Sequence, residues 1–152
     1  MLLRRLIKNC PPKFANVKIK GLASDSRKVK KGYIFFAING QKTNGEKYIN
    51  DAIQKGAEVI VCKKNSKYFN KKIYVTKTTD IRLLLSEICA KFYNLKPKNI
   101  IAVTGTNGKT SVADLFYQIL SLNRVPVASI GTLGIKYKKK LYKSNLTSPD
   151  TI

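Results

Sequence analysis

The chain has 152 residues, of which 43% are hydrophobic, and its 30 Lys and Arg against 8 Asp and Glu give a formal net charge of +22. This length allows one ordinary domain or two small ones, and the hydrophobic share is enough for a real core. The sequence contains no histidine, which excludes His-based catalytic triads and ordinary zinc sites.

The positive charge favours a polyanionic substrate, but nucleic acid is not the expected partner. Only five of the basic residues are Arg, the side chain that reads guanine edges and grips phosphates with two parallel hydrogen bonds. The Lys residues are spread along the chain, and Asn, Ile and Tyr are also plentiful. This pattern is typical of a general compositional bias.

The N-terminus and the cysteines indicate a reduced, cytoplasmic protein. Residues 1–8 contain no apolar run long enough for a signal peptide or a membrane span, so no membrane partner is expected. The three cysteines, Cys10, Cys62 and Cys89, lack the spacing of metal ligands. Cys62 and Cys89 lie in apolar runs and are predicted to be small core residues.

The first block of the chain alternates strand and helix patterns. Strands are predicted where apolar residues alternate or cluster, at residues 17–22, 33–38, 59–62 and 73–75. One helix is predicted after Gly45, ending near Gly56, and a second, capped by Thr79 or Asp80, up to residue 92. A polar stretch containing Pro97 then predicts a domain boundary, so a small mixed α/β domain is expected over 1–97 and a second domain over 98–152.

The second block opens with a strand pattern at 100–103, a glycine loop and a helix at about 109–122. The buried stripe predicted for this helix is Val112, Leu115, Phe116, Ile119 and Leu120. A strand at 125–130 would complete a strand–helix–strand unit with a parallel pair, and a hairpin or loop follows residues 131–134. One such unit cannot cover both faces of a parallel sheet. We therefore expect the start of a larger P-loop nucleotide-binding domain, and a chain that is a fragment.

Residues 104–111 (TGTNGKTS) predict a loop that binds the phosphates of a nucleotide. Glycine lets backbone N–H groups approach phosphate oxygens closely, and a helix N-terminus favours anions. Lys109 is expected to reach the β- and γ-phosphates as the catalytic residue, and Thr110 to coordinate Mg²⁺. Val103 stands where the strict pattern has glycine, so a simple turn between a core strand and a helix remains an alternative. The predicted ATP-binding residues are Gly105, Thr106, Asn107, Gly108, Lys109, Thr110 and Ser111.

Four segments together resemble the Mur ligases, the ATP-dependent amide-bond-forming enzymes of peptidoglycan precursor synthesis. Residues 25–40 are similar to the D-S-R-x-V-x-x-G-x-I-F-x-A-x-x-G signature of their N-terminal UDP-sugar-binding domain, and 104–110 reproduce their TGTNGKT loop. Residues 131–134 (GTLG) and 147–150 (TSPD) resemble segments of the MurE branch, although Ser148 replaces a Thr. That branch adds the third amino acid to UDP-N-acetylmuramoyl-L-alanyl-D-glutamate.

The resemblance implies a site for the UDP-N-acetylmuramoyl-dipeptide. Ser24 and Ser26 would contact this substrate, the loop of Gln41, Lys42 and Thr43 would lie against its uridine diphosphate, and Thr147 and Ser148 would reach its muramoyl-dipeptide end. Simpler explanations stay open. They are a plain turn at 25–26, a solvated hairpin loop at 40–45, a helix cap at 147–150, and an ion-pairing role for Arg27 in place of a diphosphate contact.

The resemblance also implies a mechanism. ATP phosphorylates the D-glutamyl carboxylate, and the amine of the acceptor amino acid, meso-diaminopimelate or L-lysine, then displaces phosphate, while Lys109 and Mg²⁺ neutralise charge. The full enzyme is expected to be a monomer, and this chain alone to be inactive. The alternatives are the D-Ala-D-Ala-adding Mur ligase, a ligase like folylpolyglutamate synthetase, and a non-catalytic module that binds anionic ligands or nucleic acid.

Overall fold

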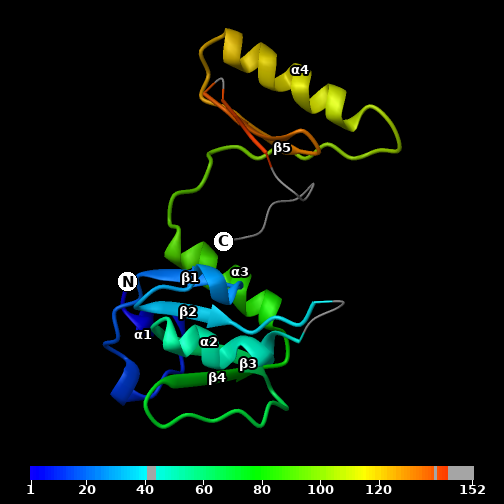
Figure 1. The fold of residues 1–152 in the computed structure, drawn as a ribbon. Coiled ribbons are helices and arrows are strands. Elements are labelled where there is room, and N and C mark those ends of the chain that lie inside the picture. The colour runs from blue at the N-terminus through cyan, green and yellow to red at the C-terminus, as the bar shows by residue number, and fades with distance from the viewer. Residues whose placement is uncertain (41–43, 139, 144–152) are drawn as a thin grey trace. The chain divides into compact units, whose positions relative to one another are not determined.

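The chain forms two compact units, one built on Met1–Lys96 and the other on Pro97–Asp150 (Figure 1). The structure is a computed structural model, and it describes residues 1–40, 44–138 and 140–143. The assignment of a separate binding role to each of the two predicted domains stays a prediction.

Unit 1 contains a parallel sheet of four strands in the order β1-β2-β3-β4. The first strand begins at Gly21 and not at residue 17 as predicted, because Lys18 instead pairs with Leu2 in an isolated antiparallel bridge. The other three strands form where they were expected. The strands are β1 (Gly21–Ala23), β2 (Tyr33–Phe36), β3 (Ala57–Lys63) and β4 (Tyr74–Thr78).

Helices cover both faces of this sheet (Figure 1). One face packs against α1 (Leu3–Leu6) and α3 (Ile81–Phe92), and the other against α2 (Ile49–Gln54), which the 3₁₀ turn η3 (Gly45–Tyr48) precedes. Because successive side chains of a strand point to opposite faces, Ile34 and Phe36 join the first core cluster and Phe35 the second. Two further 3₁₀ turns, η1 (Pro12–Phe14) and η2 (Ser26–Lys28), lie in connections.

In unit 1 the structure confirms a predicted helix cap and two predicted buried cysteines, but it contains one helix that was not predicted. Asp80, one of the two predicted caps, caps α3: its Oδ1 accepts hydrogen bonds from the backbone N–H groups of Arg82 (2.9 Å) and Leu83 (3.0 Å). Cys62 and Cys89 are buried, also as predicted. The short helix α1 was not predicted, yet its Leu3 and Leu6 side chains are almost completely buried.

Unit 2 consists of a helix and an antiparallel sheet of three strands in the order β5-β6-β7. The predicted phosphate loop leads into the helix, and β6 and β7 lie where a hairpin or loop was predicted after residues 131–134. Among the described helices this one is the longest, at 14 residues, and none of them has the length and apolar character needed to cross a bilayer. The elements are α4 (Lys109–Leu122), β5 (Ala128–Gly131), β6 (Gly134–Tyr137) and β7 (Lys140–Tyr142).

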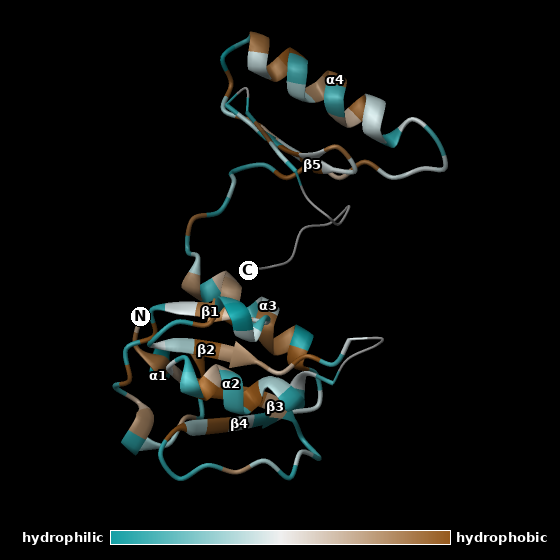
Figure 2. Cartoon of the chain, viewed as in Figure 1, coloured by the Kyte–Doolittle hydropathy of each residue, from teal (hydrophilic) through white to brown (hydrophobic). Residues whose placement is uncertain are grey.

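Two expectations for unit 2 are wrong. The parallel pair of 100–103 with 125–130 does not form, because β5 pairs with β6 and residues 100–103 belong to no strand of the described chain. The stripe on α4 is not buried either, as Val112, Leu115, Phe116 and Ile119 are between 41% and 57% exposed and Leu120 is half-buried. The reason is that no second layer among the described residues covers these apolar side chains. Figure 2 colours several residues along α4 as hydrophobic.

We expect Leu85→Ala to destabilise unit 1 and Leu83→Ala to leave its stability nearly unchanged. Both residues lie on α3, but Leu85 is 3% exposed in the core and Leu83 is 58% exposed. Truncating a buried Leu costs about 2–5 kcal/mol because it leaves a cavity, whereas a surface substitution stays within about 0.5 kcal/mol. Urea unfolding with hydrogen exchange of the β2 and β3 amides measures both. An equal loss of unfolding free energy in the two variants would contradict the burial of Leu85 in the core.

Candidate functional site

The loop before α4 turns sharply at a glycine. Gly108 is the N-cap of α4 and has a φ of +76°, in the left-handed region that side chains disfavour. A Cβ at Gly108 would meet nothing within 4 Å. The backbone conformation, and not crowding, is therefore what calls for glycine here, and the space beside the turn is open to a ligand.

The N-terminus of α4 is suited to an anion. The first backbone N–H groups of a helix have no partner within the helix, and the helix dipole places partial positive charge there. The first turn of α4 contains no acidic residue, and Gly108 provides no side-chain cap. Residues 104–111 are all exposed, so all the predicted ATP-binding residues are on the surface of unit 2.

Lys109 lies over the loop that precedes it. Its Nζ donates hydrogen bonds to the carbonyl oxygens of Gly105 and Thr106, the second at 3.0 Å. The ammonium group is thereby held next to the open turn and the first amides of α4. A cation and a set of N–H donors at one place can bind the oxygens of a phosphate chain.

Thr110 contacts the hairpin of the same unit. Its Oγ1 lies 3.0 Å from Oγ1 of Thr132, which stands in the turn between β5 and β6. The described residues contain no cluster of three or more His, Cys, Asp or Glu that could hold a metal ion by itself. A single hydroxyl at a helix N-terminus instead fits Mg²⁺ that arrives with phosphate oxygens and retains several waters.

In unit 1 the predicted substrate residues follow the carboxyl end of β1. Ser24 is half-buried there, and Ser26 is buried with its hydroxyl hydrogen-bonded to the Asp51 carboxylate of α2, which lowers the pKa of Asp51. Arg27 forms a bidentate ion pair with Asp25, with Nη2–Oδ2 and Nε–Oδ1 distances of 2.8 and 3.0 Å. The structure thus brings Ser24 and Ser26 to one edge of the sheet and gives Arg27 a structural partner.

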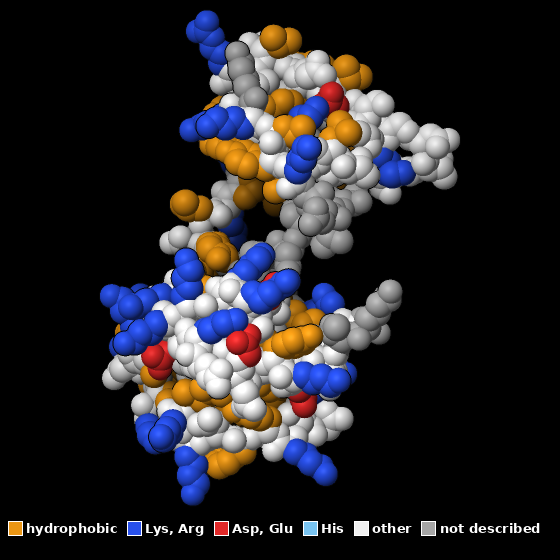
Figure 3. All heavy atoms as spheres, viewed as in Figure 1, with side chains coloured by type: hydrophobic (Ala, Val, Ile, Leu, Met, Phe, Trp, Pro, Cys, Tyr) orange, Lys and Arg blue, Asp and Glu red, His pale blue; other side chains and the backbone are white. Residues whose placement is uncertain are grey.

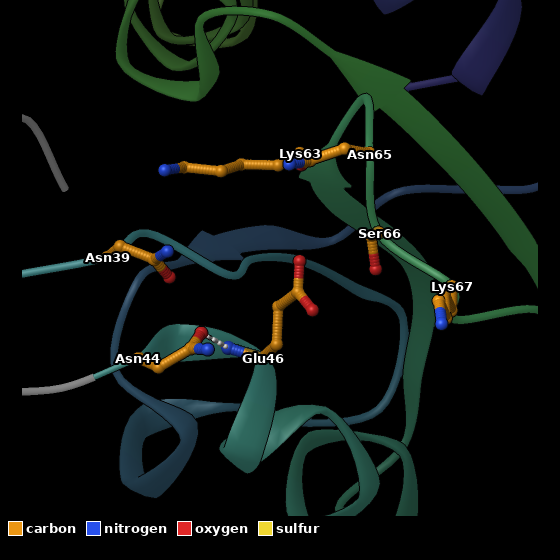
Figure 4. Close-up of a pocket in the computed structure, with 7 residues that line it drawn as sticks. All are labelled: Asn39, Asn44, Glu46, Lys63, Asn65, Ser66 and Lys67. Atoms are coloured by element: carbon orange, nitrogen blue, oxygen red, sulfur yellow. Dashed lines mark hydrogen bonds between the residues drawn. The ribbon is translucent and has the colours of Figure 1, made fainter.

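A polar pocket of about 380 Å³ lies at the same edge, after the ends of β2 and β3 (Figure 4). Oδ1 of Asn39 accepts from Gly45 N and Oδ1 of Asn44 accepts from Glu46 N, both at 3.0 Å. The amide NH₂ groups therefore remain as donors for a ligand. The lining residues are Asn39, Asn44, Glu46, Lys63, Asn65, Ser66 and Lys67.

The start of η3 packs closely against the segment that follows β2. A Cβ on Gly45 would lie 2.4 Å from the Ile38 carbonyl oxygen, so only glycine fits this position. The contact sets where Asn44 and Glu46 stand in the pocket. Sequence reasoning missed the pocket residues, although the rule that ligands bind beyond the carboxyl ends of parallel strands points to this edge.

Several predicted residues lie outside the described residues. These are Gln41, Lys42 and Thr43, between the pocket residues Asn39 and Asn44, and Thr147 and Ser148 near the end of the chain. In unit 1 the structure places the two predicted serines at one edge of the sheet. In unit 2 it places the predicted phosphate-binding residues in one loop before α4. Their contacts with substrates stay predictions.

Basic side chains lie at many places on the face shown in Figure 3, with uncharged and acidic side chains among them. The described residues near the pocket include Lys63 and Lys67, which are both exposed. The general charge of the chain attracts anions, and the local geometry must supply selectivity.

Two family models match the chain. The model described as Mur ligase family, catalytic domain, matches residues 18–93, and the Mur ligase middle domain matches residues 103–152. Together the two matches include both the carboxyl edge of the unit 1 sheet and the loop before α4.

Named relatives agree with these matches. A UDP-N-acetylmuramoyl-L-alanyl-D-glutamate–2,6-diaminopimelate ligase of Zymomonas mobilis subsp. mobilis is 43% identical over 141 residues, which is 93% of this chain and 29% of that protein. The enzyme of the same name from Rickettsia prowazekii is 44% identical over 124 residues, 81% of this chain and 25% of that protein. The chain thus spans about a quarter to three-tenths of these relatives.

A solved structure extends the likeness to the fold. The structure of a UDP-N-acetylmuramoyl-L-alanyl-D-glutamate–2,6-diaminopimelate ligase matches with a TM-score of 0.75 and 25% sequence identity. The match covers 99% of this chain and 31% of that one. It supports the α/β architecture of unit 1 and the loop–helix arrangement of unit 2.

The ion pair at the end of β1 predicts a measurable pKa. Hydrogen bonds from the Arg27 side chain and backbone lower the pKa of Asp25 from 3.8 to about 2. Since folding lowers this pKa, the stabilisation is present above pH 4 and is lost as the pH falls through about 2. We expect Arg27→Gln to raise the pKa of Asp25 towards 3.8, measured by carboxyl ¹³C NMR. Lys28→Gln is the control, with a much smaller effect, and an unchanged pKa in Arg27→Gln would contradict the pairing.

Proposed function

The chain belongs to the Mur ligase family, and from this premise we propose that it holds the precursor-binding unit and the phosphate-binding loop of an ATP-dependent ligase. The ligase would join diaminopimelate to UDP-N-acetylmuramoyl-L-alanyl-D-glutamate through an amide bond. The observation that carries the proposal is the glycine loop that presents Lys109 and the amides of α4 at an open helix N-terminus. The names of the relatives favour diaminopimelate over L-lysine as the acceptor.

Unit 2 would bind the nucleotide. The loop amides and the Lys109 ammonium would bind the β- and γ-phosphates of ATP, and Thr110 would provide an oxygen ligand to Mg²⁺. Magnesium would neutralise charge on the phosphates when bound. Lys109 is already near the loop, so exchanging its two carbonyl partners for phosphate oxygens requires only a change of side-chain conformation.

Unit 1 would bind the uridine diphosphate end of the precursor at the carboxyl edge of its sheet. Ser24 and Ser26 follow β1, and the pocket with Lys63 follows β3, so hydroxyls, amides and cations meet at this edge. Amide and hydroxyl groups suit a base and a ribose, and a lysine suits a diphosphate. The predicted loop residues Gln41, Lys42 and Thr43 would complete this site.

The proposed reaction proceeds in two steps. The γ-phosphoryl group of ATP passes to the D-glutamyl carboxylate, which releases ADP and gives an acyl phosphate. The amine of diaminopimelate then attacks the acyl carbon, the C–O bond to phosphate breaks, and the amine loses a proton. In the first step Lys109 would stabilise charge on the transferring phosphoryl group, which is positioning and electrostatic work. Magnesium, cytoplasmic location and a monomeric state remain predictions.

We expect Lys109→Ala to weaken the binding of Mg²⁺–ATP by about 10- to 100-fold, because a hydrogen bond to a charged group contributes about 1.5–3 kcal/mol. Binding of a fluorescent ATP analogue to the chain measures this. Lys98→Ala removes an exposed lysine from the same unit and is expected to bind ATP as the unchanged chain does. Undiminished binding by Lys109→Ala would exclude this loop as the ATP site.

The precursor site is tested by charge reversal. We expect Lys63→Glu to weaken the binding of UDP-N-acetylmuramoyl-L-alanyl-D-glutamate about tenfold, because it replaces an attraction for the diphosphate by a repulsion. Lys98→Glu makes the same change of net charge and should have little effect. NMR titration of the ¹⁵N-labelled chain gives both affinities and the amides that shift. Equal weakening by the two variants would indicate general charge attraction, and the proposed pocket would be wrong.

A further inference from the structure

Helix α4 contacts the β5–β6 hairpin through polar side chains. Thr110 and Asp114 are one turn apart on α4, and they meet Thr132 of the turn and Lys136 of β6. Asp114 also accepts a hydrogen bond of 2.8 Å from Gln118, and the hydrogen bond from Lys136 is the main cause that lowers the pKa of Asp114. These contacts set the position of the hairpin along the helix.

The backbone of the hairpin fixes the place of Thr132. Gly131 pairs with Gly134 across β5 and β6, so Thr132 and Leu133 form the turn between them. Gly134 has a φ of +97°, and a Cβ there would lie 2.4 Å from the carbonyl oxygen of Tyr142 in the neighbouring chain segment. The turn is thus held on one side by the sheet and on the other by the contact of Thr132 with α4.

The Thr110 hydroxyl needs a partner for its proton when its oxygen binds a cation. A hydroxyl has one donor and two acceptor lone pairs, and an oxygen that lends a lone pair to Mg²⁺ can still donate its hydrogen. Oγ1 of Thr132, at 3.0 Å, is placed to accept it. Such an acceptor would orient the free lone pairs of Thr110 away from the hairpin.

We propose that Thr132 is a positioning residue that accepts the Thr110 proton and so holds the Thr110 oxygen ready for the magnesium ion of a bound nucleotide. The proposal rests on the proposed function of the loop. Thr132 itself touches neither the metal ion nor the reacting atoms. Partners of this kind typically contribute 10- to 100-fold to the affinity for the metal ion.

The test compares two substitutions of one side chain. Thr132→Val keeps the shape but removes the hydroxyl, and we expect the Mg²⁺ concentration that half-saturates ATP-analogue binding to rise by about tenfold. Thr132→Ser keeps the hydroxyl and is expected to restore the original Mg²⁺ dependence. With EDTA in place of Mg²⁺, both variants should bind the analogue as the unchanged chain does. Ser129→Ala removes a hydroxyl three residues away on the same hairpin and is the matched control.

The Thr110→Val background identifies the route of the effect. If Thr132 acts through Thr110, adding Thr132→Val to the Thr110→Val variant raises the half-saturating Mg²⁺ concentration no further. A full additional rise of about tenfold in the double variant would overturn the proposal. It is also overturned if Thr132→Val leaves the Mg²⁺ dependence unchanged, or if Thr132→Ser fails to restore it. If Thr132→Val disturbs the NMR spectrum of the hairpin, Thr132→Ala takes its place in each comparison, because it removes the same hydroxyl. Failure of the proposed function would appear separately, as ATP binding that does not depend on Lys109.

Discussion

A parallel β-sheet exposes apolar side chains on both of its faces, and each face needs a layer of other elements against it. Unit 1 meets this requirement, since α2 covers one face and α1 with α3 covers the other. As a result its strands are buried, their carboxyl ends are held in register, and the groups that follow them converge at one edge. The positions of Ser24 and of the pocket residues, Lys63 among them, derive from that coverage.

In unit 2 the described residues do not supply the layers that a parallel sheet needs. Its described residues supply one helix and an antiparallel sheet of three strands, and these cover neither face of a parallel pair. Residues 100–103 therefore lie outside any strand, although their composition favours one. The loop and the N-terminus of α4 nevertheless keep their geometry, because a glycine at positive φ and helical hydrogen bonds are local features.

Features that depend only on neighbouring residues could be predicted from the sequence, and features that depend on distant segments could not. The Asp80 cap, the strands β2 and β3 and the burial of Cys62 are signalled by neighbouring residues, and the structure contains them. The helix α1 is four residues long, too short for a helical repeat to be visible, and tertiary packing alone reveals it. The pocket combines segments that are far apart in the sequence, so only the order of the strands in the sheet brings Asn39 and Lys63 together.

The orientation of α4 depends on its polar face. Thr110, Asp114 and Gln118 recur at every fourth position and so lie along one side of the helix, with Leu115 and Ile119 turned away from it. Thr132 hydrogen-bonds to Thr110 on this side of the helix, and Lys136 donates to Asp114, so these bonds join the helix to the β5–β6 hairpin. Hydrogen bonds have stricter geometry than apolar contacts. A helix held in this way presents its first turn at a defined position, which is what a phosphate-binding loop requires.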